Sequence, residues 1–294
     1  MSRPLLLLAL LLPGAALADP AELPARVADL SGARAQGMGD AFRAIGSGNE
    51  AIFLNPAAIE SQPRYQLDAS GLLDLGRPQG SFGASILDST EGPVGGGVAF
   101  TRFYSGPAGS RTVANVFHLA LAVPLGPNVA LGASGKWLHL EDLGRANAVT
   151  PDLGLLVHLE LLSVALVAYN LVDIHSLQTP RQFAAAVVVG PDASWKAALD
   201  VVADTASHPD PSFAFHLGGE YSPLSYLAVR AGYVEDRIRG DRLLTAGMGV
   251  FFPPGIGLDL AYRHQLGGEL PARVLALNIK LQPFTPEPPD QFAE

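Results

Sequence analysis

Three polar residues, His118, Ser134 and Asp152, have the types that a hydrolase uses as base, nucleophile and orienting acid. Each lies on a different one of three successive segments with strand periodicity, at a position that we expect to face one shared interior. Nucleophilic catalysis requires hydrogen-bond reach between nucleophile and base, and the sequence spacing does not establish that contact. Scattered polar residues are common in such interiors, so we expect no enzyme, no catalytic residue and no cofactor.

Other chemical motifs are weak. No histidine pair has metal-ligand spacing, and the chain has no cysteine, so we expect no metal site. Gly95-Gly96-Gly97 lacks the strand-to-helix context and the lysine of a phosphate-binding loop. In a strand, this run is expected to mark a bulge or kink, and a kink could leave a side opening for an apolar solute. The net charge of −9, without basic runs, argues against a nucleic-acid partner.

A larger set of charged residues shares one face of the predicted strands. The set comprises Lys196, Asp200, Glu220, Arg230, Asp259 and Arg263, with Arg273 and Lys280 on the same face. Four charged residues nearer the N-terminus could pair with them: Arg34, Asp40, Arg43 and Glu50. Buried charges must be paired when they are desolvated. We therefore expect a static, compensating network, and the alternative is a latch whose rearrangement opens a path.

The elements that would position these residues are segments of about ten residues with period-two alternation. The expected strands cover residues 64–73, 79–87, 94–103, 112–123, 128–140, 149–159, 162–170, 180–189, 193–203, 212–221, 226–234, 242–252, 256–265 and 272–282. One face is bulky and apolar, as in Ile256, Leu258 and Leu260. The other is small or charged, as in Asp259 and Arg263.

A soluble β-fold and a membrane β-barrel both alternate in this way. The chain is 48% hydrophobic and only 16% charged. Longer polar connections, such as 204–211, alternate with short turns, such as 222–225, and the strand number is even, as in outer-membrane barrels. Aromatic residues gather near strand ends, where a membrane interface would lie. They are Trp195, Tyr221, Phe251, Phe252 and Phe284 at one rim, and Trp137, Tyr169, Phe183, Tyr233 and Tyr262 at the other.

We therefore predict an all-β, closed antiparallel transmembrane barrel of about fourteen strands, in contact with the lipid of a Gram-negative outer membrane. A soluble β-fold is the alternative. Residues 1–18 have the charged start, apolar run and Ala16-Leu17-Ala18 site of a signal peptide. We assign 19–62 to an N-terminal helical hatch or plug, 63–284 to the barrel and 285–294 to a disordered tail.

The segment before the first strand does not resemble a strand. Ser31 is a plausible helix N-cap and Gly46 a plausible stop, and Asn55 is expected to cap a second short helix. Glycine weakens a helix by about 1 kcal/mol relative to alanine, a cost tolerated where a backbone approaches another surface. A barrel of this size leaves a wide lumen, so we expect a plug, and a mobile periplasmic tail is the alternative. The expected plug residues are Gly32, Gly37, Met38, Gly39, Phe42, Ile45, Asn55 and Pro56.

Two N-terminal motifs, Gly32 to Phe42 and Ala51 to Ala57, resemble the signature of the FadL/PorV superfamily of outer-membrane proteins. Four C-terminal stretches resemble the PorV/PorQ branch more closely: Gly218 to Leu224, Leu227 to Tyr233, Leu258 to Tyr262 and Val274 to Leu281. The resemblance implies a fourteen-stranded barrel with a lumen hatch. FadL-type members move hydrophobic compounds, and PorV-type members serve a protein-secretion system.

The expected function is passive transport of small hydrophobic molecules past a lumen plug. The alternative is a PorV-like accessory or scaffold that binds secretion-system proteins at the cell surface, and a third possibility is a purely structural barrel.

Overall fold

The structure is a computed structural model that describes residues 30–61, 63–90, 93–106, 111–140, 147–172, 179–191, 194–268 and 271–283. The predicted signal peptide (1–18), residues 19–29 of the predicted hatch, Phe284 and the predicted tail (285–294) lie outside the described residues.

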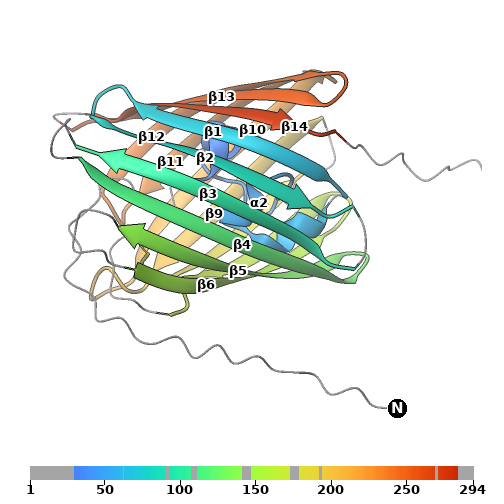
Figure 1. The fold of residues 1–294 in the computed structure, drawn as a ribbon, viewed down its shortest axis with the longest axis horizontal. Coiled ribbons are helices and arrows are strands. Elements are labelled where there is room, and N and C mark those ends of the chain that lie inside the picture. Colours follow the sequence, from blue (N-terminus) through green and yellow to red (C-terminus); the bar gives the residue numbers. More distant parts are fainter. Residues whose placement is uncertain are drawn as a thin grey trace, which may run out of the picture.

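Fourteen antiparallel strands form a closed barrel (Figure 1). They are β1 (Tyr65–Asp74), β2 (Gln79–Asp88), β3 (Gly95–Ser105), β4 (Thr112–Gly126), β5 (Val129–Leu140), β6 (Asn147–His158), β7 (Leu162–Tyr169), β8 (Gln182–Val189), β9 (Trp195–Asp204), β10 (Ser212–Leu224), β11 (Leu227–Asp236), β12 (Asp241–Phe252), β13 (Ile256–Gln265) and β14 (Arg273–Leu281). Each strand pairs with its neighbours in the chain, and β1 closes on β14 from Leu67↔Leu281 to Asp74↔Val274. The predicted closed antiparallel barrel is confirmed.

The strand boundaries agree with the prediction to within three residues. The largest differences occur at the ends of β4 and β10, which continue beyond the predicted Val123 and Tyr221. Register shifts at Pro124/Gly126 and at Tyr221/Leu224 explain these extensions, because a bulge lets a strand continue pairing past an irregular position.

The alternation of the strands places apolar side chains outside and polar side chains inside. On β13, Leu258 and Leu260 are 40% and 41% exposed, whereas Asp259 is completely buried. The neighbouring Arg263 is also buried. This arrangement is the reverse of a soluble protein, and it is the one that a barrel surrounded by lipid requires.

The glycine run at the start of β3 produces no bulge. Pairing with β2 is continuous from Gln79↔Ser105 to Asp88↔Gly96, and pairing with β4 continues through Gly95↔Ala122. The predicted bulge is therefore wrong, whereas a kink and the side opening that it could leave stay predictions. A Cβ atom at Gly97 would lie 2.7 Å from the Ile52 side chain inside the barrel, so this glycine makes room for a close contact.

Residues 30–61, the lumen segment, lie inside the barrel (Figure 1). The segment contains α1 (Gly32–Gly37), α2 (Ala51–Leu54) and a 3₁₀ helix, η2 (Pro56–Ser61). The prediction of one helix up to Gly46 is wrong, because Gly39 and Asp40 adopt positive φ angles of 64° and 60°, which end helical geometry. Among the described residues, no helix is long and apolar enough to cross a membrane.

The lumen segment runs from one end of the barrel to the other. Leu30 packs with Phe103 and Leu138, which lie near the ends of β3 and β5 at the long connections. At the other end, a Cβ atom on Gly95, the first residue of β3, would contact Ile59 and Glu60 of η2. The chain thus enters the lumen at the end with long connections and leaves it at the end with short turns, where β1 begins.

Candidate functional site

The lumen segment approaches the wall through glycine. A Cβ atom on Gly37 would lie 3.0 Å from Cα of Gly247 on β12, so the two backbones are in direct contact. A Cβ atom on Gly39 would lie 3.1 Å from the Leu217 carbonyl oxygen and from the Tyr233 nitrogen. Thr245 Oγ1 also donates to the Gly37 carbonyl oxygen at 3.0 Å. α1 therefore rests against the wall with no side chain between them.

Four glycines of the wall supply the matching space. A Cβ atom on Gly132 or Gly154 would overlap the stretch Asn55 to Ala57. A Cβ atom on Gly218 or Gly232 would overlap Met38 and Gly39. The absence of side chains at these four wall positions thus leaves the space that the lumen segment occupies.

Apolar contacts fill the space around the segment. The side chains of Met38, Phe42 and Ile52 are completely buried, and Ile45 is 8% exposed. These residues belong to one cluster that includes alanines of β3, β4, β5, β7, β8 and β9. Asn55 caps a second short helix with Pro56 at its first position, as predicted: its Oδ1 accepts from the Ala57 N–H at 3.1 Å, and the helix that follows is the 3₁₀ helix η2.

A continuous chain of ion pairs joins the lumen segment to four strands. Arg34 of α1 contacts Glu220 at 2.7 Å, Glu220 contacts Arg230 at 2.7 Å, and Arg230 contacts Asp259 at 2.6 Å. Lys280 lies 3.0 Å from Asp259 and 2.8 Å from Glu50, the residue immediately before α2. Both ends of this chain lie on the lumen segment, so the wall charges connect its two halves.

Two further ion pairs hold the middle of the segment. Asp40 lies 3.3 Å from Arg263, and Arg43 lies 3.0 Å from Asp200. Asp200 also accepts the backbone N–H groups of Phe42 and Arg43, each at 3.1 Å. Four of the five charged residues of the lumen segment thus pair with the wall, and the four cancel in charge.

Two predicted positions differ from the structure. Arg273 is exposed, and it shares the outward face of β14 with Leu277 and Ile279, so it does not belong to the interior set. Tyr169 is buried instead of lying at a lipid-facing rim: its hydroxyl donates to the Leu54 carbonyl oxygen and accepts from Nε of Arg43 at 2.8 Å. Lys196 lies 3.8 Å from Glu220, a longer contact than the other pairs of the ion-pair chain.

The three residues considered for catalysis all face the lumen, but they do not form a triad. Ser134 Oγ donates to Asp152 at 3.1 Å, and Lys136 pairs with the same carboxylate at 2.8 Å. His118 packs edge-on against Phe53, with 5.0 Å between ring centroids, and its Nδ1 has no hydrogen-bond partner. The base is therefore not joined to the nucleophile. Within the described part of the chain, no group of three or more His, Cys, Asp or Glu residues is placed to hold a metal ion.

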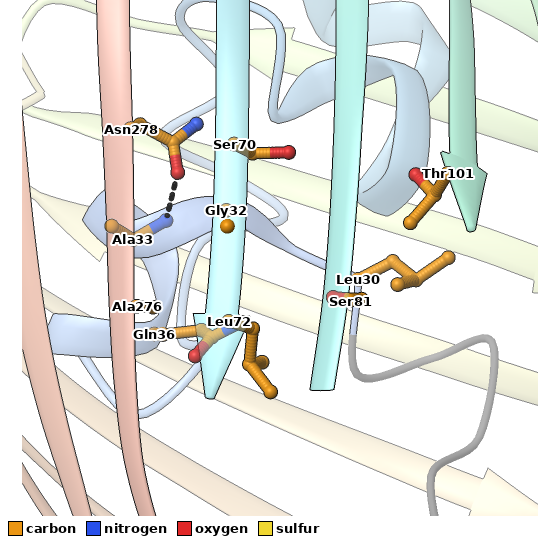
Figure 2. A pocket seen from close by; sticks show the side chains of 11 residues that line it. Leu30, Gly32, Ala33, Gln36, Ser70, Leu72, Ser81, Thr101, Ala276 and Asn278 are labelled. Atoms are coloured by element: carbon orange, nitrogen blue, oxygen red, sulfur yellow. Dashed lines mark hydrogen bonds between the residues drawn. The ribbon is translucent and has the colours of Figure 1, made fainter. Parts of the chain in front are cut away.

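A small cavity remains between the lumen segment and the wall (Figure 2). Leu30, Ala33 and Gln36 lie on the segment side, and the hydroxyl side chains of Ser70, Ser81 and Thr101 lie on β1, β2 and β3. Ala33 N donates to Asn278 Oδ1 at 2.9 Å beside it. The volume of about 20 Å³ admits about one water molecule, and no hydrocarbon ring.

The outer wall carries a larger, apolar groove across β2 to β6. Its volume is about 580 Å³. Its outward lining includes Ile86, Val98, Phe100, Phe117 and Trp137. Phe117 stacks on Trp137 with 5.4 Å between the ring centroids. This groove lies on the side of the wall that faces away from the lumen segment.

Several solved structures resemble this chain. The toluene transporter TbuX of Ralstonia pickettii aligns with a TM-score of 0.65 and 12% identity, over 85% of this chain and 98% of that one. The monoaromatic hydrocarbon channel CymD aligns with a TM-score of 0.65 and 13% identity, over 85% and 96%. A FadL homologue of Pseudomonas aeruginosa aligns with a TM-score of 0.62 and 11% identity, over 86% and 98%. No protein-family model and no curated protein sequence matches the chain.

These likenesses establish the class of the fold, which is that of the FadL-like outer-membrane barrels. The closer likeness to the PorV/PorQ branch, expected from the C-terminal motifs, is not shown by these three structures.

Proposed function

We propose that this protein is an outer-membrane barrel through which small hydrophobic molecules pass by diffusion, with the lumen segment as its plug. The observation that carries the proposal is the occupied lumen: a segment with paired charges fills a barrel whose outer surface suits lipid. Because the strand ends with short turns are periplasmic in such barrels, the end with long connections faces the cell surface.

The size of the remaining gap supports a plug that moves. The cavity of about 20 Å³ beside Leu30 is too small for an aromatic hydrocarbon, so a solute of that class could pass at this point only if the segment shifted. The hydroxyl groups of Ser70, Ser81 and Thr101 give that gap a partly polar lining.

The apolar class of solute is supported by two observations. Solved barrels of the same fold are a toluene transporter and a monoaromatic hydrocarbon channel. The outer groove of about 580 Å³ offers an apolar solute a binding surface on this chain.

Uptake by intact cells tests the proposal. Cells that express the protein should accumulate radiolabelled toluene faster than cells with an empty vector. The double variant Arg34→Gln/Glu50→Gln, which removes both ends of the ion-pair chain from the lumen segment, should accelerate uptake further. The control variant Arg111→Gln changes an exposed charge outside the lumen and should behave as the wild type. Uptake equal to that of the empty vector in all strains would refute the transport proposal.

The secretion-accessory alternative predicts a different pattern. Such a protein would give no change in toluene uptake, and it would be recovered in a complex with secretion-system proteins. No described feature of the lumen or the rims favours that function over transport.

A further inference from the structure

Of the four arginines that are exposed in the described part of the chain, three lie on one sector of the barrel, and the fourth, Arg111, precedes β4. Arg237 follows β11, Arg242 lies at the start of β12, and Arg273 begins β14, all at the end with long connections. The side chains of Arg237 and Arg242 are 68% and 64% exposed, and Arg273 is also exposed. We call these three residues the arginine rim.

The pairing of the strands places the arginine rim on one continuous outer surface. Arg242 lies opposite Glu235 on β11, and Arg273 lies opposite His264 on β13. Neighbouring strands are about 4.8 Å apart, so the rim extends over about 15 Å from β11 to β14. Aromatic residues lie directly below it: Tyr262 contacts His264 at 3.2 Å, and Arg237 stacks over Phe215 at 5.5 Å.

The acidic groups near the arginine rim have other hydrogen-bond partners as well. Glu235 lies 3.9 Å from Arg237 and 3.4 Å from Arg242, so one carboxylate serves two cations through long contacts. That carboxylate also accepts from the Tyr233 hydroxyl at 2.6 Å. Asp236 is occupied by the turn that follows it, where it accepts the Ile238 and Arg239 N–H groups. Asp241, beside Arg242, accepts from Gln265 Nε2 at 2.6 Å, and Asp74 accepts from the Arg273 backbone N–H at 3.1 Å. The guanidinium groups of the rim therefore keep N–H donors for a further acceptor.

The opposite end of the barrel has no such surface. Within the described residues, the outward positions next to the short turns are apolar or aromatic, as in Tyr221, Phe252 and Ile256. The described cations there are directed toward the lumen: Arg64 donates to Gln66 at 3.2 Å, Lys196 lies 3.8 Å from Glu220, and Lys280 lies 2.8 Å from Glu50. Outward-facing cations thus distinguish the two ends, although both would meet a membrane surface.

We propose that the arginine rim binds the phosphorylated head group of a lipid in the cell-surface leaflet. Guanidinium groups bind phosphate through paired N–H donors. The aromatic residues below would contact the start of the acyl chains, as side chains at membrane interfaces do. The exposed guanidinium donors, the aromatic residues below them and the restriction to one end of the barrel together select this occupant. The inference rests on the proposed placement in the outer membrane.

Lipid binding by the purified protein in uncharged detergent micelles tests this site. The probe is diphosphoryl lipid A, and binding is measured by titration or by mass spectrometry of the intact complex. The variant Arg237→Gln/Arg242→Gln/Arg273→Gln should lose about a hundredfold in affinity, since each arginine near an anionic lipid surface contributes less than a tenfold factor. Arg242→Gln alone should lose about fivefold. The control Arg77→Gln/Arg102→Gln/Arg111→Gln removes the same charge from the same end of the barrel.

The affinities of the arginine-rim variants and of the control variant for lipid A distinguish the possible outcomes. Binding that falls only in the arginine-rim variants, and that millimolar inorganic phosphate does not displace, supports a lipid site. Equal losses in both triple variants would show general attraction by net charge and overturn the proposal. Unchanged affinity in the arginine-rim triple variant would also overturn the proposal. Displacement of lipid A by inorganic phosphate would overturn it too, because it would indicate a site for free phosphate. Toluene uptake is measured separately, so failure here is distinguishable from failure of the transport proposal.

Discussion

Replacing Gly37 with valine should loosen the lumen segment without breaking the barrel. A Cβ atom at this position lies 3.0 Å from Gly247 Cα and 3.4 Å from Gly247 N. Carbon atoms normally pack at about 3.5–4.0 Å, so α1 must move by about 0.5–1 Å for the Cβ alone, and further for the valine methyl groups. Overpacking of this kind costs about 1–3 kcal/mol.

That displacement also acts on the ion-pair chain. Arg34 lies one turn before Gly37 on the same helix, and its Nη2 is 2.7 Å from Glu220. A shift of about 1 Å would take this contact beyond ordinary hydrogen-bond distance. The segment would then lose its first anchor together with its contact to β12, and the lumen would become wider and more hydrated.

Single-channel conductance in planar bilayers measures this effect. We expect Gly37→Val to conduct more than the wild type and less than a deletion of residues 29–61 that keeps the signal peptide. Gly135→Val is the matched control, because a Cβ atom there meets no atom within 4 Å. If folded Gly37→Val conducts as the wild type does, the contact with β12 does not hold the segment in place. If the folded deletion variant also conducts as the wild type does, the segment does not obstruct the lumen, and a periplasmic docking role would be favoured.

Three further outcomes follow from the same structure. The protein should migrate differently on a detergent gel before and after boiling, because a closed barrel leaves no unpaired strand edge; recovery as a soluble protein with one migration rate would contradict the membrane placement. Leu260→Arg should impair insertion, at a cost of about 2–4 kcal/mol near the membrane centre, whereas Ala261→Ser in the lumen should insert normally; equal tolerance would mean that the faces of β13 are reversed. Asp200→Asn should lower the temperature at which the gel shift occurs, since breaking a buried ion pair costs about 3–5 kcal/mol, and Arg43→Gln added to it should restore part of the loss; strictly additive losses would show that the two residues do not interact.

The barrel could be predicted because its rules are local. A period of two assigns each side chain to a face, and each strand pairs with the next one in the chain, so no long-range arrangement had to be inferred. The same rule would also have corrected one error. Tyr169 lies an even number of residues from Ser163, Ala165 and Val167, all buried, and so shares their inward face. The prediction places Tyr169 at the rim because it is aromatic, although its position in the alternation indicates the inward face.

The lumen segment could not be predicted in the same detail. Its residue types indicated close backbone contact, but its helices are only six and four residues long, too short for helical periodicity to define. The positive φ angle of Asp40 is stabilised by partners distant in sequence, among them Arg263. Composition likewise gave no signal for the contact between Gly37 and Gly247, because a close approach depends on the register of two separate elements.

The passage of the lumen segment through the whole barrel constrains the order of assembly. Leu30 lies at one end and η2 at the other, and only the η2 end continues directly into the wall. If the barrel closed first, four charged side chains would have to be drawn through a finished lumen before meeting their partners, and unpaired charges in such surroundings are costly. We therefore expect the junction between β1 and β14 to form last, around a segment already paired with β9 to β13. The lumen segment would then also serve as an internal template for closure.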